Sequence, residues 1–187
     1  MQYSPLISKY LKQLTSLSTD KQATVLDLAC GSGRNGLYLI ENGVPVTFAD
    51  VNSVAIDQVQ QHVAMINNKQ RANFWSIDFE QDGVSPLTGK YFAAIMVFRY
   101  LHRPLFEQIK QAILPGGIII YETFTEQQAQ FGRPKNPDFL LKEGELADIF
   151  SAWEILHSFE GITGSANNSG SKQAIAQIVA RKPNLNE

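Results

Sequence analysis

The chain has 187 residues, with 16 lysines and arginines against 18 aspartates and glutamates, so its formal charge is −2, and 44% of its residues are hydrophobic. Globular domains rarely exceed about 250 residues, so we expect residues 1–187 to form a single domain. This length excludes a dinucleotide-binding domain followed by a full substrate domain. A nucleic-acid surface needs clustered positive charge, which this composition does not offer, so no nucleic-acid partner is expected.

The lone cysteine, Cys30, excludes an intramolecular disulfide and any metal site that requires several thiolates. The first residues lack the charged and apolar regions of a secretory signal. No apolar run approaches the roughly 18 residues of a membrane span. We therefore expect a cytoplasmic protein with neither a membrane partner nor a metal ion.

Along the chain, short apolar runs alternate with segments of helical periodicity. The N-terminal segment 1–20 begins with an amphipathic helix, predicted over 3–17. Strands are then predicted at 25–28, 46–49, 74–77, 92–98 and 118–121, with helices between them at 36–41, 55–66 and 105–113. This alternation is typical of α/β proteins with a mostly parallel sheet.

The C-terminal third departs from this alternation. Residues 123–137 are polar and rich in Gly and Pro, which favours a functional loop or a short helical insertion. A helix is predicted over 140–150. Two strands follow at 153–159 and 174–180, and the small, polar residues 161–170 between them favour an antiparallel pair joined by a flexible connection.

A glycine-rich motif lies between the first strand and the first helix of the alternating region. Gly31-Ser32-Gly33-Arg34-Asn35-Gly36 matches G-x-G-x-x-G, where glycines let the backbone approach a ligand and a helix N-terminus offers N–H donors. A tight turn without a ligand is the alternative. Leu37 stands where a phosphate-binding P-loop has lysine, which argues against NTP hydrolysis.

An aspartate ends the second predicted strand. Asp50 lies 19 residues after Gly31, where a carboxylate accepts hydrogen bonds from both ribose hydroxyls of a nucleoside. The alternative is a solvated strand end or a cap of the helix that begins near Asn52.

The segment 25–35, Val-Leu-Asp-Leu-Ala-Cys-Gly-Ser-Gly-Arg-Asn, resembles the first motif of class I S-adenosylmethionine-dependent methyltransferases. Three further features agree with this family: acidic residues after the second and third strands, Pro-Gly-Gly before the fifth strand, and two closing strands. The small-molecule branch, with its tellurite-resistance and thiopurine methyltransferase-like proteins, is the most similar. Ala29 departs from the glycine that many members carry.

The resemblance implies a Rossmann-like, doubly wound, seven-stranded, mostly parallel sheet that ends in an antiparallel hairpin of the last two strands. It also implies S-adenosylmethionine as cofactor, bound by Asp27, Ala29, Gly31, Gly33, Asp50, Val51, Asp78, Phe79 and Phe98. Asp78 and Phe79 would contact the adenine, and Asp27 the positive end of the cofactor. Two alternatives stay open: Asp27 holding the glycine loop through backbone N–H groups, and Asp78 forming a simple turn.

The acceptor is expected beyond the carboxyl ends of the fourth and fifth strands. The residues there that we expect to bind it are Arg99, Tyr100, Arg103, Thr123 and Arg133, and the segment 123–141 is expected to cover it as a lid. If the acceptor must lose a proton, Glu122 or His102 is the best placed catalytic group. Surface charges, a structural carboxylate and a plain surface insertion are the respective alternatives.

The sequence therefore predicts methyl transfer from S-adenosylmethionine to a small acceptor, which is anionic if the arginines line its pocket. A non-catalytic cofactor-binding or scaffold protein of the same fold is the main alternative. An NAD-dependent oxidoreductase is less favoured, because none of the six tyrosines has the lysine four residues on that short-chain dehydrogenases use.

Overall fold

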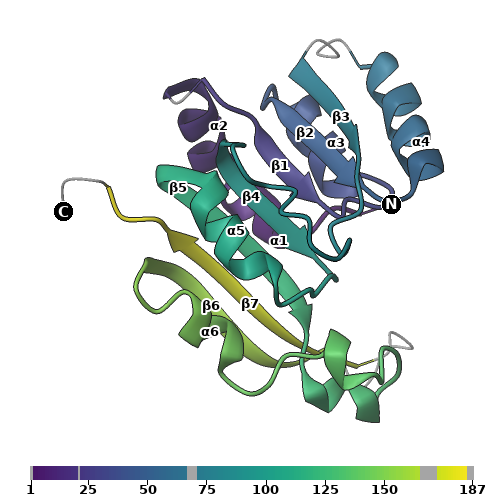
Figure 1. Cartoon of the computed structure of the whole chain (residues 1–187), viewed down its shortest axis with the longest axis vertical. Coiled ribbons are helices and arrows are strands. Elements are labelled where there is room, and N and C mark those ends of the chain that lie inside the picture. Colours follow the sequence, from purple (N-terminus) through teal and green to yellow (C-terminus); the bar gives the residue numbers. More distant parts are fainter. Residues whose placement is uncertain (1, 21, 67–70, 165–171, 185–187) are drawn as a thin grey trace.

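The computed structural model describes residues 2–20, 22–66, 71–164 and 172–184. Seven strands form one sheet in the order β3-β2-β1-β4-β5-β7-β6 (Figure 1). The strands are β1 (Val25–Leu28), β2 (Val46–Asp50), β3 (Ala72–Ser76), β4 (Phe92–Phe98), β5 (Ile113–Phe124), β6 (Glu154–Thr163) and β7 (Gln173–Arg181). Neighbours from β3 to β5 are parallel, whereas β7 is antiparallel to both β5 and β6. This arrangement confirms the predicted fold class.

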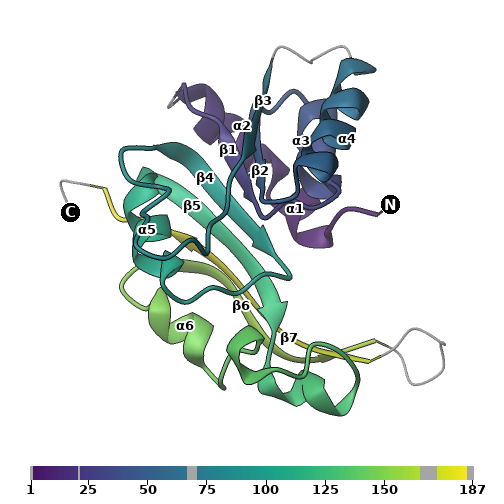
Figure 2. The same cartoon turned by 45° about the vertical axis from the view of Figure 1, so that its right-hand side comes forward.

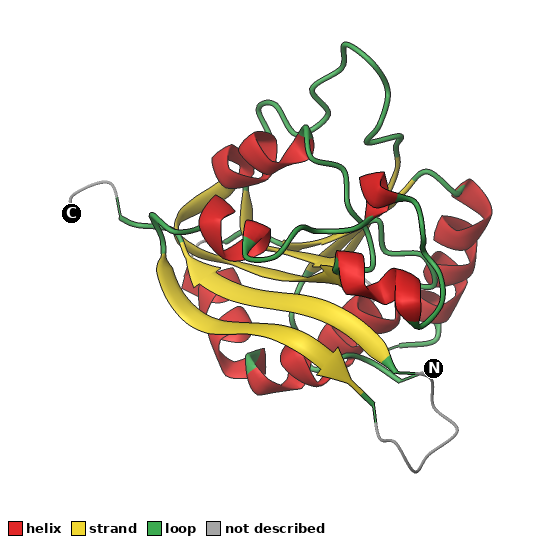
Figure 3. Cartoon of the chain, turned by 90° about the horizontal axis from the view of Figure 1, so that it is seen from below, coloured by secondary structure: helices red, strands yellow, loops and turns green. Residues whose placement is uncertain are grey.

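Helices cover both faces of the sheet (Figures 1 and 3). Four of them share one face: α1 (Pro5–Lys9), α2 (Leu11–Asp20), α3 (Arg34–Glu41) and α4 (Ser53–Ala64). The other face packs against α5 (Leu105–Ala112), α6 (Glu145–Ile149) and the connection from β3 to β4. Because both faces are covered, the central strand β4 consists of apolar residues alone, and six of its seven residues are buried.

Many elements differ from the predicted bounds by a few residues, and the first helix and the fifth strand differ in their course as well. The predicted helix 3–17 is interrupted at Tyr10, which leaves helical geometry and donates its hydroxyl to the Leu156 carbonyl of β6. The fifth strand starts at Ile113 and contains the Pro-Gly-Gly turn: the Gly116 N–H donates to the carbonyl of Lys182, directly after β7, and the Lys182 N–H donates to the Gly117 carbonyl. A Cβ on Gly117 would lie 2.5 Å from a backbone oxygen of β4, so only glycine allows this close approach.

The helix predicted over 140–150 is shorter than expected. Leu141 instead forms a parallel bridge with Thr125, and its N–H donates to the Phe124 carbonyl. Gly144, at φ 73°, then begins α6. Of the flexible connection predicted over 161–170, residues 165–170 lie outside the described part of the chain. No helix among the described residues has both the length and the apolar character needed to cross a membrane.

The parallel strands β1 to β5 all point the same way, so their carboxyl ends share one edge of the sheet. Residues 125–141 lie beside the end of β5 at this edge (Figure 2). They contain two short 3₁₀ helices, η2 (Glu126–Gln130) and η3 (Pro137–Phe139). The edge therefore brings together the glycine loop, the acidic strand ends and the segment predicted as a lid.

Candidate active site

Asp50 accepts two backbone hydrogen bonds, one of them from the glycine loop. Its Oδ2 accepts from the Gly31 N–H at 2.8 Å, and its Oδ1 accepts from the Asn52 N–H at 2.9 Å. The cap of α4 is Asn52, whose Oδ1 accepts from the Ala55 N–H at 3.2 Å. A carboxylate has about four acceptor positions, so Asp50 keeps roughly two for a ligand.

Asp27 is the buried carboxyl of this edge, with 3% of its surface exposed. Its Oδ2 accepts from the Gly36 N–H at 3.0 Å in the first turn of α3. Burial raises the pKa of Asp27 to about 8, although the Gly36 N–H and the charge of Arg34 act in the opposite direction. A nearby cation would favour the ionised form of this carboxyl.

The three glycines of the motif have different surroundings. Gly31 has φ 52°, and a Cβ built on it would meet nothing within 4 Å, so space is open in front of the loop. A Cβ on Gly33 would lie 2.7 Å from Val59, and one on Gly36 would lie 2.3 Å from Phe48. The last two glycines therefore let the loop and α3 pack closely against α4 and β2.

Two residues other than glycine have positive φ at this edge: Ala29 after β1, at 52°, and Arg99 after β4, at 59°. Backbone strain of this kind persists only where surrounding contacts hold it, and it gathers at functional sites. Cys30, the next residue after Ala29, has a pKa raised by burial and by Asp27 and Asp50. Its thiol therefore stays protonated, which does not suit a nucleophile.

The other predicted cofactor residues lie around the same edge and differ in how exposed their side chains are. Val51 is 64% exposed, and Asp78 is also exposed and accepts from the Glu80 N–H at 2.8 Å. Phe79 is buried and packs edge-on against Trp75, so its ring belongs to the core. Phe98 is half-buried against the core that α1 to α4 cover.

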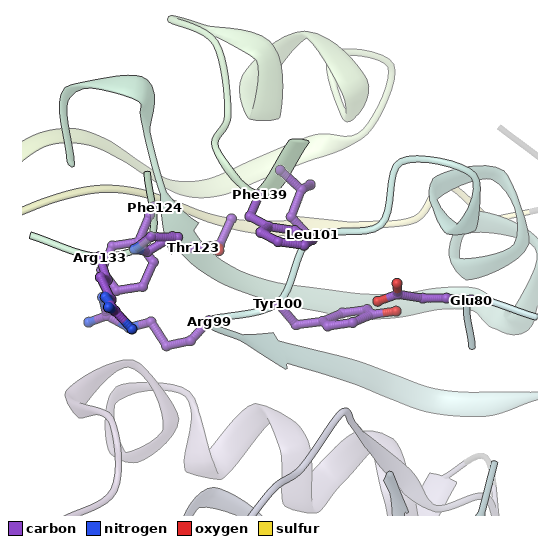
Figure 4. A pocket seen from close by; sticks show the side chains of 9 residues that line it. Glu80, Arg99, Tyr100, Leu101, Thr123, Phe124, Arg133 and Phe139 are labelled. Carbon is purple, nitrogen blue, oxygen red and sulfur yellow. The ribbon is translucent and has the colours of Figure 1, made fainter. Parts of the chain in front are cut away.

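A pocket of about 430 Å³ opens at the ends of β4 and β5 (Figure 4). Its lining is Glu80, Arg99, Tyr100, Leu101, Thr123, Phe124, Arg133, Pro134 and Phe139. Four of these residues are among the predicted acceptor-binding residues. Four others, Leu101, Phe124, Pro134 and Phe139, come from residues 125–141 or flank the predicted ones. Glu80 is the residue that the sequence interpretation missed, and its place two residues after Asp78 was the available signal.

Arg99 lines the pocket and is held in place by three contacts. Its Nη2 lies 3.1 Å from Glu122 Oε1 and donates to Gln173 Oε1 at 2.9 Å. Its guanidinium carbon lies 4.4 Å from the centre of the Phe124 ring. The other terminal nitrogen, Nη1, is buried and has no hydrogen-bond partner among the described residues. This nitrogen is a donor that a ligand could satisfy.

Glu122 uses both carboxylate oxygens within the protein. Oε1 faces Arg99, and Oε2 accepts from Gln177 Nε2 at 2.7 Å. The Gln177 Oε1 lies 3.0 Å from His157 Nε2, which fixes the orientation of the amide. His102 accepts the Leu105 N–H through its carbonyl at the start of α5, and its ring is not part of the pocket lining. The structure thus places neither predicted catalytic group free in the pocket.

Arg103 lies away from the acceptor pocket. Its guanidinium binds both Glu145 oxygens, at 2.7 and 2.8 Å, and donates to the carbonyls of Asp138 and Leu140. These hydrogen bonds raise the pKa of Arg103 and lower that of Glu145. Arg103 therefore fastens the C-terminal end of segment 125–141 to α6, instead of joining Arg99 and Arg133 as the sequence interpretation expected.

The opposite part of this segment is fastened by Gln128. This buried amide donates to the Arg133 carbonyl at 3.1 Å and accepts from the Ala174 N–H of β7 at 2.9 Å. The segment is therefore attached to the sheet on both sides of the residues that line the pocket. Among the described residues, no group of three or more His, Cys, Asp or Glu side chains could hold a metal ion.

Comparison with known proteins places the chain in a family. Residues 8–174 match the family described as tellurite resistance protein TehB. The chain belongs to this family. It is 26% identical, over 171 residues, to the "Probable S-adenosyl-L-methionine-dependent methyltransferase TehB" of Haemophilus influenzae. This match covers 84% of the chain but 57% of the family member's length, so the chain spans little more than half of that relative.

Solved structures show the same fold. The crystal structure of TehB from Haemophilus influenzae has a TM-score of 0.69 at 22% identity, and the match covers 91% of this chain and 62% of that one. The glycopeptide N-methyltransferase MtfA, solved with S-adenosyl-L-methionine, has a TM-score of 0.65 at 13% identity, with 97% and 88% covered. At these identities the likeness concerns the fold alone.

Proposed function

We propose that the chain is a methyltransferase that uses S-adenosylmethionine to methylate a small, anionic acceptor. The observation that carries this proposal is the open glycine loop between Asp27 and Asp50, at the same sheet edge as the pocket of Arg99 and Arg133. The name of the TehB relative and the cofactor in the MtfA structure support the choice of cofactor. A cytoplasmic location is part of the proposal.

The residues present fit this cofactor. The space in front of Gly31 leaves room for a ligand against the backbone, and the free acceptor positions of Asp50 suit the two hydroxyls of a ribose. Asp27 supplies a carboxyl that becomes ionised next to a cation. When bound, S-adenosylmethionine would supply a methyl group on a positively charged sulfur. As the methyl group moves to the acceptor, the electron pair of the broken S–C bond stays on the sulfur.

The acceptor pocket supplies positive charge. None of the ion pairs among the described residues involves Arg133, and Arg99 keeps a buried Nη1 without a partner. Two guanidinium groups lining one pocket attract an anion and orient it. Because the methyl donor is already activated, the protein's main task is to align the acceptor's nucleophilic atom with the methyl group and to exclude water.

Thermal stability in the presence of ligands tests the cofactor. We expect S-adenosylmethionine and S-adenosylhomocysteine to stabilise the protein by about 2.7 kcal/mol at 100 times their dissociation constants, with no effect of NAD. Stabilisation by NAD alone would indicate the oxidoreductase, and no response to any of the three would overturn the proposal in favour of a scaffold. Asp50→Ala should weaken cofactor binding at least tenfold in calorimetry.

Arg133→Gln tests the acceptor site. This arginine has no counter-ion among the described residues, so its loss leaves no buried charge unpaired. We expect weaker binding of carboxylates and unchanged affinity for S-adenosylhomocysteine. Arg99→Gln is a poorer choice, because it would leave the buried Glu122 without its cation; the double variant Arg99→Gln/Glu122→Gln avoids this. Loss of cofactor binding in the Arg133 variant would show that the acceptor site is misplaced.

A further inference from the structure

The pocket has opposite charges at its two ends. Figure 4 shows Arg99 and Arg133 on one side of the pocket and Glu80 on the other, with the Tyr100 ring between them. We propose that the acceptor is bipolar, with an anionic group at the arginine end and an amine or other cationic donor at the Glu80 end. This inference rests on the proposed function and narrows its substrate class.

The Glu80 end has two polar groups that face each other, the Glu80 carboxylate and the Tyr100 hydroxyl. None of the ion pairs among the described residues involves Glu80, although its carboxylate lines the pocket. Tyr100 turns its hydroxyl toward this carboxylate (Figure 4), and burial together with the charge and hydrogen bonding of Glu80 raises the pKa of Tyr100. A protonated amine donates to both oxygens at once, which neither an anion nor an apolar group can do.

The middle of the pocket is apolar. Leu101 is buried there, whereas Phe139, from η3, keeps 48% of its surface exposed. An apolar or aromatic body between the two charged groups of the acceptor would cover this ring. The volume of about 430 Å³ also exceeds what a single inorganic oxyanion fills.

The charges also discriminate against other ligands. A dianion with a second negative group would place it against Glu80, and a diamine would place a cation against Arg99 and Arg133. Unfavourable placement of like charges is a source of specificity in its own right. The pocket therefore selects one orientation of a bipolar acceptor, with its anionic group at the arginines and its cationic group at Glu80.

Calorimetry with the protein saturated in S-adenosylhomocysteine tests this inference. The probes are 4-(aminomethyl)benzoate, which carries both charges, 4-methylbenzoate, which carries the carboxylate alone, benzylamine and inorganic phosphate. We expect 4-(aminomethyl)benzoate to bind at least tenfold more tightly than the other three. Glu80→Gln should remove this advantage without changing the affinity for 4-methylbenzoate. Glu143→Gln, an exposed glutamate outside the pocket, is the matched control and should change neither.

The outcomes separate this inference from the proposed function. If 4-methylbenzoate binds as tightly as 4-(aminomethyl)benzoate, with Arg133→Gln weakening both and Glu80→Gln weakening neither, the bipolar acceptor is overturned and the anionic acceptor stands. If no carboxylate binds and Arg133→Gln has no effect, the anionic acceptor is overturned too. If a Tyr100→Phe variant keeps the tenfold preference, the Tyr100 hydroxyl does not contribute to it, and Glu80 alone binds the cationic group.

Discussion

Asp27→Asn should change how the stability of the fold depends on pH. In the folded protein, burial raises the pKa of Asp27 to about 8, whereas an unfolded chain gives aspartate a pKa of about 3.9. Between these two values the folded state binds one proton more than the unfolded state. The free energy of unfolding therefore falls as the pH rises through this window, and the contribution is lost by about pH 8.

The size of this effect follows from the width of the window. Each pH unit changes the free energy of unfolding by about 1.4 kcal/mol, so roughly four units give an upper limit of about 5 kcal/mol. Asparagine stays neutral at every pH, and its Oδ1 can still accept from the Gly36 N–H that Asp27 now binds at 3.0 Å. The variant should match the natural protein near pH 4 and become progressively more stable in comparison up to pH 8.

Urea unfolding at several values between pH 4 and pH 8, with each variant compared at the same pH, measures this difference. Comparing the two proteins cancels the contributions of groups that they share. Asp57→Asn is the matched control for replacing an aspartate by asparagine, because Asp57 is exposed on α4. A difference between Asp27→Asn and the natural protein that stays constant from pH 4 to pH 8 would refute the reasoning.

Three further outcomes are expected. Binding of S-adenosylmethionine at pH 7 should release close to one proton from Asp27, measured by calorimetry in two buffers of different ionisation enthalpy; no buffer dependence would contradict a cation beside this carboxyl. Gly36→Ala should destabilise the fold by about 1–3 kcal/mol in urea, because its Cβ would lie 2.3 Å from Phe48; an unchanged midpoint would disprove the tight packing. Arg103→Gln should lower the free energy of unfolding by about 1–2 kcal/mol, and by less in acid, where Glu145 becomes protonated even though its hydrogen bond to Arg103 lowers its pKa; weaker binding of S-adenosylhomocysteine would show that Arg103 does more than fasten its segment.

The sequence was sufficient for the fold because its signals are local. Apolar runs such as 92–98 become central strands, and the glycine motif needs only the strand before it and the helix after it. Asp27 and Asp50 lie at the predicted edge of the sheet. Both accept hydrogen bonds from backbone N–H groups of the glycine motif, which was the alternative role that the sequence left open for Asp27. Parallel pairing then brings these residues together without further information.

The acceptor side was harder to predict, because the partner of a charged side chain can lie far away in sequence. Arg103 and Arg99 follow the same strand, yet Arg103 pairs with Glu145, 42 residues on, and Arg99 with Glu122. Nothing local distinguishes these two arginines. Glu80 likewise enters the pocket through the path of the connection between β3 and β4, which has no periodic pattern to interpret.

The pairing of Glu122 has a consequence for proton transfer. A general base must reach the acceptor by a hydrogen bond, but Glu122 is not among the pocket-lining residues, and its two oxygens face Arg99 and Gln177. Its buried negative charge instead holds the Arg99 guanidinium in the pocket wall, with Nη1 left for the ligand. In the proposed reaction, Glu122 is thus a positioning residue, and an acceptor whose nucleophilic atom is already deprotonated suits this site better than one that needs a base.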